Sequence, residues 1–162
     1  EDSRSFCLDA LRISSTAIRE ALANDDLTLA EKLLGRPYRI LGRVIHGNEL
    51  GRTIGFPTAN IRLHRQVNPV KGVYAVRVRL KSGAFFNGVA NIGTRPTING
   101  VNQLLEAHLF DFQGDLYGQW LDVELCHKIR NEMKFSCFDD LKDQIAKDVE
   151  TAKNVFKTDR TL

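Results

Sequence analysis

The sequence lacks the motifs of several common enzyme classes. The stretch GRVIHG at 42–47 has the glycine spacing of a phosphate-binding loop, but it continues with Asn-Glu, where that loop needs Lys and then Ser or Thr. There is no GxSxG nucleophile elbow, no HExxH zinc motif and no HxGH pairing among the four histidines. The chain is therefore not a P-loop enzyme, and it carries no marker of these hydrolases, zinc proteases or nucleotidyltransferases.

Cysteines and long apolar runs are also scarce. Cys7, Cys126 and Cys137 form no CxxC pair, so we expect reduced thiols and neither a disulfide framework nor a zinc site. No apolar run approaches the ~20 residues of a membrane helix, and no charged-then-apolar signal segment opens the chain. We therefore expect a cytoplasmic protein with no membrane partner. The opening EDSRSF, without a starting methionine, suggests a fragment or a processed chain.

Charge of one sign is not concentrated along the chain. The 162 residues include 23 Lys and Arg against 20 Asp and Glu, which gives a formal net charge of +3. Nucleic-acid-binding proteins more often show a basic stripe, so we expect no nucleic-acid partner. A small anionic ligand is compatible with this composition.

The order of the patterns predicts a mainly β fold between two helical parts. Residues 1–35 read as helical, with Ser15 and Asp26 as N-caps and Gly35 as the stop. Strand-like runs follow in YRILGRVIHG, GVYAVRVRL, AFFNGVANIG, NQLLEAHLFDF and QWLDVELC. Beyond a candidate cap at Ser136, apolar residues recur at helical spacing. We predict a six-stranded antiparallel barrel over about 37–127, a long C-terminal helix over about 136–157 and an N-terminal helical appendage.

The stretch GRTIGFPTAN at 51–60 combines flexible and rigid residues. Gly51 and Gly55 permit backbone shapes or close approaches that side chains forbid, and the proline favours an extended entry into a strand. In that strand Thr58 and Asn60 point to the same side and offer neutral oxygens, which suit Mg²⁺ when nucleotide phosphates supply the negative charge. The alternatives are a mobile hairpin loop and an ordinary turn into an edge strand.

Glu106, in NQLLEAHLF, is a candidate catalytic base. Its strand face is shared with Leu104, His108 and Phe110, which predicts that the carboxylate is drawn into an otherwise apolar interior. A carboxylate there is costly unless it is partnered or used, and it could accept the proton of an attacking hydroxyl. A solvent-facing glutamate on the polar side of the strand fits the pattern equally well.

Two further polar segments accompany the predicted strands. NIGTRPTI places Asn91, Thr94 and Arg95 in a predicted turn, where the arginine is either a phosphate clamp or a surface residue. KIRNEMKF, just before the last helix, offers an aromatic ring beside polar groups. That mixture could stack on and hydrogen-bond a planar heterocycle, and a plain loop packed on the barrel fits as well.

Taken together, these segments resemble the riboflavin kinase family. The shared motifs are GRTIGFPTAN, VKGVYAVRV, GVANIGTRPT and LEAHLFDFQGDLYG, in this order, and the resemblance spans about 37–157. It implies ATP-dependent phosphorylation of the riboflavin ribityl 5′-hydroxyl to give FMN. It also implies a six-stranded Greek-key barrel with a C-terminal helix.

The resemblance implies roles for individual residues. Glu106 would be the catalytic base, and Thr58 and Asn60 would bind Mg²⁺ and the nucleotide phosphates. The other nucleotide-binding residues would be Gly47, Gly51, Arg52, Gly55, Asn91, Thr94 and Arg95, with the glycine-rich segment forming a flap over ATP. The flavin would contact Arg130, Glu132 and Phe135.

The lead-in RISSTAIREAL has a resemblance of its own. It is similar to the last motif of the FMN adenylyltransferase module of bacterial bifunctional FAD synthetases, in which the kinase module follows directly. Residues 1–35 would then be the helical tail of that absent module, and 36–162 the kinase domain. The implied partners are riboflavin or FMN, ATP or ADP, and the missing N-terminal module. Residual adenylyltransferase activity and a non-catalytic flavin- or oligonucleotide-binding barrel are the alternatives.

Overall fold

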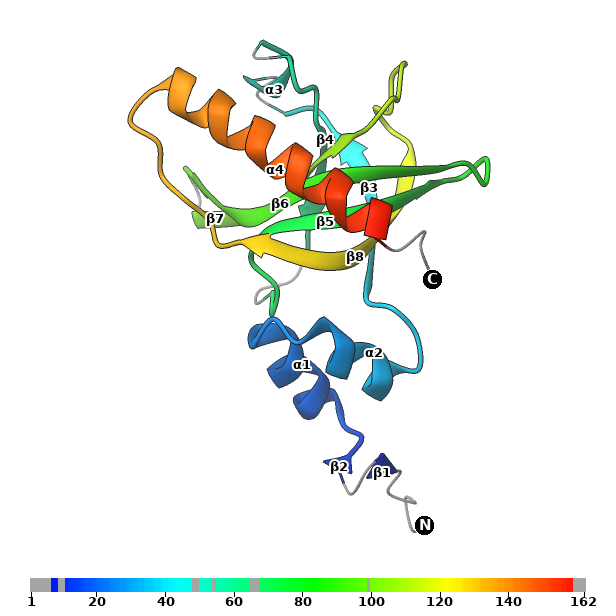
Figure 1. Cartoon of the computed structure of the whole chain (residues 1–162). Coiled ribbons are helices and arrows are strands. Elements are labelled where there is room, and N and C mark those ends of the chain that lie inside the picture. Colours follow the sequence, from blue (N-terminus) through cyan, green and yellow to red (C-terminus); the bar gives the residue numbers. More distant parts are fainter. Residues whose placement is uncertain are drawn as a thin grey trace.

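The chain folds around a closed barrel of antiparallel strands. The computed structural model describes residues 7–8, 11–47, 50–53, 55–64, 68–98 and 100–158. The six barrel strands are β3 (Arg39–Ile45), β4 (Ala59–Leu63), β5 (Gly72–Leu80), β6 (Phe85–Thr97), β7 (Gly100–Leu109) and β8 (Trp120–Arg130). The helix α4 (Phe138–Thr158) lies across the barrel, and α1 (Ser15–Ala23) and α2 (Leu27–Leu34) lie below it in the view of Figure 1. The predicted barrel and C-terminal helix are confirmed, whereas the prediction that residues 1–35 are helical is wrong for 7–8 and 11–12, which pair as two short strands before the first helix.

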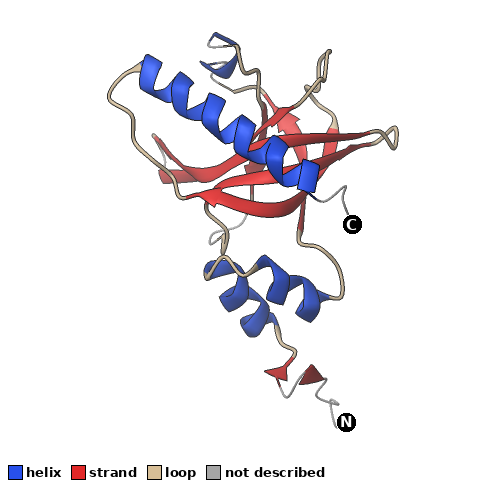
Figure 2. Cartoon of the chain, viewed as in Figure 1, coloured by secondary structure: helices blue, strands red, loops and turns tan. Residues whose placement is uncertain are grey.

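The smaller elements lie before the barrel and at its rim (Figure 2). A two-stranded ribbon of β1 (Cys7–Leu8) and β2 (Leu11–Arg12) precedes the helices, and the short helix α3 (Leu50–Thr53) follows β3. No helix among the described residues is long and apolar enough to cross a membrane.

The strand order is what brings distant motifs together. Around the barrel the order is β3-β4-β7-β6-β5-β8, and β3 closes it by pairing with both β4 and β8. β5, β6 and β7 are successive antiparallel neighbours, whereas β4 lies beside β7, which is the Greek-key arrangement. β4, β7 and β6 are therefore adjacent, although their motifs are separated along the sequence.

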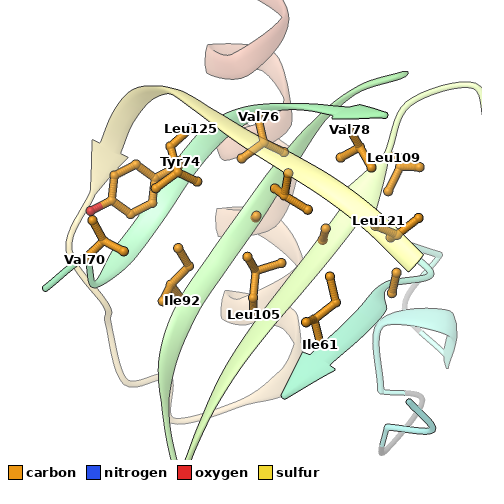
Figure 3. Close-up of a cluster of buried hydrophobic side chains, with 14 of the residues drawn as sticks. Ile61, Val70, Tyr74, Val76, Val78, Ile92, Leu105, Leu109, Leu121 and Leu125 are labelled. Atoms are coloured by element: carbon orange, nitrogen blue, oxygen red, sulfur yellow. The ribbon is translucent and has the colours of Figure 1, made fainter. Parts of the chain in front are cut away.

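The alternation of side chains along each strand fills the barrel with apolar groups. Tyr74, Val76 and Val78 of β5 and Leu105 of β7 point inward and are fully buried (Figure 3). Ala107 of β7 is buried in the same cluster. The next side chains along each strand point to the outer face. The interior is thus a packed core, so any ligand site has to lie outside it or at its ends.

Helix α4 covers part of the outer face. It packs on β5, β6 and β8, where its residues Val149, Ala152 and Phe156 are buried in a second apolar cluster. Arg130 of β8 binds Asp148 of α4 through an ion pair of 2.7 Å, and Asp148 is only 3% exposed. Since both the apolar contact and the ion pair join the same elements, the position of α4 over the barrel is well defined.

Helix boundaries agree only partly with the sequence patterns. The cap at Asp26 is confirmed, because its Oδ1 accepts a hydrogen bond from the backbone N–H of Leu29. The first helix is capped by Ser14 and not by Ser15, since Ser14 Oγ accepts from the N–H three residues on. α4 begins at Phe138, so the predicted cap at Ser136 lies one residue too early.

Asp25 joins the N-terminal helices to the barrel. Its Oδ1 accepts from Lys128 Nζ at 2.6 Å and from the Tyr74 hydroxyl at 3.2 Å. Burial, followed by the nearby charge of Asp25, raises the pKa of Tyr74 far above its usual range. The hydroxyl therefore stays protonated at all ordinary pH values and remains a donor. Leu22 of α1 and Ala30 of α2 are buried in the same cluster as the barrel interior, so the contact combines polar and apolar parts.

We expect Asp25→Asn to lower the free energy of unfolding by about 1 kcal/mol, because it removes the charge that Lys128 and Tyr74 contact. The side chain of Asp25 is 40% exposed, which keeps the effect modest. Thermal unfolding should show a decrease in Tm of about 2–4 °C. Asp111→Asn is the matched control, since Asp111 is exposed and shares the positive φ of Asp25, 56° against 61°. Equal decreases in Tm for the two variants would contradict the stabilising role of the contact between Asp25 and the barrel.

Candidate functional site

The candidate site begins with a row of polar side chains on the outer face of the barrel. Asn60 of β4 pairs with Glu106 of β7, which in turn pairs with Asn91 of β6. Directly paired residues point to the same side of a sheet, so the three side chains form one transverse row. Leu105 and Ala107 occupy the inward positions beside Glu106. The prediction that Glu106 is drawn into the barrel interior is therefore wrong.

A cavity of about 370 Å³ lies between this row and α4, and we call it the helix-side cavity. Leu141 and Ile145 of α4, with Phe56 and Met133, supply apolar walls. The predicted site residues that line it are Thr58, Asn60, Asn91, Arg95, Glu106, Arg130, Glu132 and Phe135. The outer face thus carries a pocket with apolar walls and convergent polar groups, the usual character of a small-molecule site.

A second cavity, of about 580 Å³, lies on the other side of Asn60, and we call it the loop-side cavity. It is lined by the end of β3 with Gly47 and Arg52, and by the connection between β7 and β8. Thr58 and Asn60 line both cavities. Ligands held in the two cavities would therefore meet at these two side chains.

The side-chain amide of Asn60 is buried and closely packed against Gly47. Asn60 is 6% exposed, and its Nδ2 donates to the backbone carbonyl of Thr58 at 3.4 Å. A Cβ atom at position 47 would collide with the Asn60 amide group, so Gly47 provides the space that it needs. The Asn60 amide oxygen and the Thr58 hydroxyl are neutral oxygen donors, and this pair fits Mg²⁺, which completes its shell with water and phosphate oxygens.

Glu106 is engaged in an ion pair. Its Oε2 accepts from Arg95 Nη2 at 2.6 Å. Arg95 Nη1 also lies 3.5 Å from Glu132 Oε1, and Asn91 Nδ2 donates to that same oxygen at 3.4 Å. A Cβ atom at position 93 would collide with the Glu132 carboxylate, so Gly93 leaves room for it. Two carboxylates, one guanidinium and one amide therefore form a continuous polar network at the edge of the helix-side cavity.

The segment NIGTRPTI is not a turn. β6 continues to Thr97, and Pro96 pairs with Val101 of β7, so the predicted turn at 91–95 is wrong. Asn91 and Arg95 line the helix-side cavity and lie with Glu106. Thr94 is exposed and is not among the described residues that line either cavity.

The predicted flap lies at the mouth of the loop-side cavity. Gly47 and Arg52 line that cavity, and Gly51 lies in the short helix α3. Gly55 is exposed just after α3 and does not line either described cavity. Residues 48–49 and 54 of the flap lie outside the described residues.

The three predicted flavin-contacting residues come together in the helix-side cavity. The guanidinium of Arg130 lies 5.9 Å from the centre of the Phe135 ring, and Glu132 lies between them in the sequence. The ion pair with Asp148 of α4 fixes the position of the Arg130 guanidinium. An aromatic ring beside apolar walls and charged groups at the rim suits a planar heterocycle with polar edges.

Among the residues that line this cavity, sequence reasoning assigned no site role to His108 and Asp148. His108 Nδ1 lies 2.9 Å from the carbonyl oxygen of Pro57, which ties the entry of β4 to β7. It stands two positions from Glu106 on the same strand face, and that spacing could have identified it. Asp148 is the acidic residue of α4 that lies three residues after Ile145 and four before Ala152, and this position on the apolar face of the helix could have separated it from the exposed acidic residues.

Comparisons with known proteins place most of the chain in one family. A family model described as Flavokinase, riboflavin kinase, matches residues 34–156. A bifunctional riboflavin kinase/FMN adenylyltransferase of Haemophilus influenzae is 79% identical over 158 residues, which cover 98% of this chain and 51% of that protein. The chain spans about half the length of the curated relatives that it matches.

Two solved structures resemble the fold. A Streptococcus pneumoniae structure named as a macrolide-efflux protein gives a TM-score of 0.81 at 38% identity, covering 93% of this chain and 49% of that one. Riboflavin kinase from Trypanosoma brucei gives a TM-score of 0.52 at 24% identity, covering 75% of this chain and 78% of that one. The second likeness supports the barrel fold alone.

Proposed function

The chain belongs to the riboflavin kinase family, and from this premise we propose that it transfers the γ-phosphoryl group of ATP to the ribityl 5′-hydroxyl of riboflavin, giving FMN and ADP. The observation that carries the proposal is the meeting of two cavities at Thr58 and Asn60, with Glu106 facing one of them. Phosphoryl transfer requires two substrates whose reacting ends are held next to each other, and adjoining cavities provide that placement.

We assign ATP to the loop-side cavity and riboflavin to the helix-side cavity. Gly47 and Arg52 line the former, and Phe135 and Arg130 line the latter beside apolar walls that suit the flavin ring. Thr58 and Asn60 would hold Mg²⁺ where the cavities meet. When bound there, the cation would neutralise charge on the transferring phosphoryl group.

Glu106 is assigned as the base. As the 5′-hydroxyl oxygen bonds to the γ-phosphorus, its O–H bond breaks and Glu106 takes the proton, while the bond from the γ-phosphorus to the ADP oxygen breaks. The transition state of such transfers is loose, so the base mainly orients the hydroxyl. The segment with Gly47 and Arg52 would limit the access of water, which competes with riboflavin as the phosphoryl acceptor.

The relatives suggest the setting of this reaction. Their names pair a riboflavin kinase with an FMN adenylyltransferase, and this chain matches only half of their length. We propose that the kinase unit follows an adenylyltransferase module in the full-length protein, and that its product FMN is the substrate of that module. Because the reaction consumes ATP, we place it in the cytoplasm.

A product assay tests the proposed function. We expect this chain, mixed with riboflavin, ATP and Mg²⁺, to form FMN alone, and we expect EDTA to abolish the reaction because the phosphate-bound cation is removed. Chromatography separates the flavins. Riboflavin binding without conversion would indicate a non-catalytic flavin-binding barrel, and FAD among the products would show that adenylyltransferase activity resides in this chain.

A further inference from the structure

We propose that Arg95 positions the catalytic base Glu106 and does not bind the nucleotide. The inference rests on the proposed function and reassigns a residue that the sequence motif places with ATP. Its basis is the 2.6 Å ion pair between Arg95 Nη2 and Glu106 Oε2, within the helix-side cavity.

The register of β6 and β7 explains how the two side chains meet. Asn91 pairs directly with Glu106, and Arg95 lies four residues further along β6 on the same outer face. Four strand residues span about 13 Å, so the long arginine side chain reaches back along the face to the carboxylate. The guanidinium thereby enters the helix-side cavity, where Arg95 is a lining residue, and Arg95 is not among the described residues that line the loop-side cavity.

A second carboxylate fixes the other side of the guanidinium. Glu132, in the segment between β8 and α4, lies 3.5 Å from Arg95 Nη1 and accepts a hydrogen bond from Asn91. Gly93 lies under the Glu132 carboxylate, where any side chain would collide with it. Arg95 therefore lies between the carboxylates of Glu106 and Glu132. The absence of a side chain at Gly93 of β6 leaves room for the second carboxylate.

The pair has a clear consequence for the reaction. Arg95 engages Oε2 of Glu106, so we assign Oε1 as the oxygen that accepts the proton of the riboflavin hydroxyl. The guanidinium fixes the plane of the carboxylate through a charge-assisted hydrogen bond. It also provides a positive charge beside Glu106, so the base keeps a stabilising partner while its cavity is filled by the flavin.

Arg95→Met tests the inference by separating kcat from KM. We expect kcat to fall about 10- to 100-fold, because misplacing a reacting group by about 1 Å costs on this order. The KM for ATP should stay within about twofold of wild type, since no phosphate contact is lost. Arg95→Lys, which keeps the charge, should recover part of kcat. Arg62→Met is the matched control, because Arg62 is an exposed arginine on β4 that does not line either described cavity.

Gly93→Ala provides a second variant that leaves both members of the ion pair in place. Displacement of Glu132 should lower kcat in the same direction as Arg95→Met but by less, with the KM for ATP again unchanged. A large increase in the KM for ATP with kcat retained in Arg95→Met would overturn the inference and restore a nucleotide-binding role. Unchanged kcat in that variant would overturn it as well. Both outcomes require a wild-type chain that makes FMN, so they are distinct from failure of the proposed function.

Discussion

Replacement of Glu106 by Gln should lower kcat about 100-fold or more, which is the range expected when a general base is removed. Gln keeps the size of the side chain but cannot take up the hydroxyl proton. The change lies in the helix-side cavity, while the nucleotide is assigned to the loop-side cavity, so the KM for ATP should stay within about twofold of wild type. The rate of FMN formation under saturating riboflavin and ATP is the measurement.

Glu124→Gln is the matched control for this substitution. Glu124 also lies on the outer face of a barrel strand and pairs with arginines, with Arg39 at 3.1 Å and Arg77 at 3.5 Å, but it does not line either described cavity. Its variant should keep kcat near the wild-type value. If Glu106→Gln retained kcat to within a few-fold, or if the control lost as much activity, Glu106 would not be the base.

Asn60→Ala should raise the KM for Mg-ATP on the order of 10- to 100-fold, the scale on which metal sites lose affinity when a supporting group is removed. The substitution removes a buried amide that lines both cavities, so the cation would lose one of its two proposed protein ligands. Thr58→Ala should act in the same direction. The measurement is the dependence of the initial rate on Mg-ATP and on free Mg²⁺.

Two comparisons distinguish a metal ligand from a merely structural residue. Gly47→Ala should mimic Asn60→Ala, because the added methyl group would displace the Asn60 amide without touching its chemistry. Raising Mg²⁺ should partly restore Asn60→Ala and leave Glu106→Gln unchanged. Asn87→Ala, on β6 and outside the described linings of both cavities, serves as the control. An Asn60→Ala variant with unaltered Mg²⁺ dependence would remove this residue from the metal site.

Most of the barrel could be predicted from the sequence, because apolar and polar residues alternate along its strands and its turns carry recognisable residues. The side of the sheet to which Glu106 points could not be predicted. Alternation shows that Glu106 points away from Leu105 and Ala107, but it does not show which side is the interior. Leu104 and Phe110, which share this face with Glu106 and His108, are apolar although the face is the outer one. Phe110 is buried against α4. Because a helix covers this part of the outer face, its residues are apolar like those of the barrel interior.

The candidate site was predictable in composition but not in its connections. The two-residue spacing predicted that Thr58 and Asn60 point to the same side, and both line the two cavities. The contact between Arg95 and Glu106 depends on the register of β6 against β7, which the strand patterns leave open. Pro96 also misled the prediction, because proline usually ends a strand, whereas here it lies near the end of β6 and the strand continues to Thr97.

A crystal structure of the chain with riboflavin, ADP and Mg²⁺ would test the two-cavity arrangement directly. We predict that the flavin ring lies in the helix-side cavity beside Phe135, that the phosphates of ADP lie in the loop-side cavity near Gly47, and that Mg²⁺ contacts Thr58 and Asn60. The ribityl chain should lead from the flavin ring towards Glu106. Riboflavin in the loop-side cavity, or both ligands on the same side of Asn60, would contradict the account.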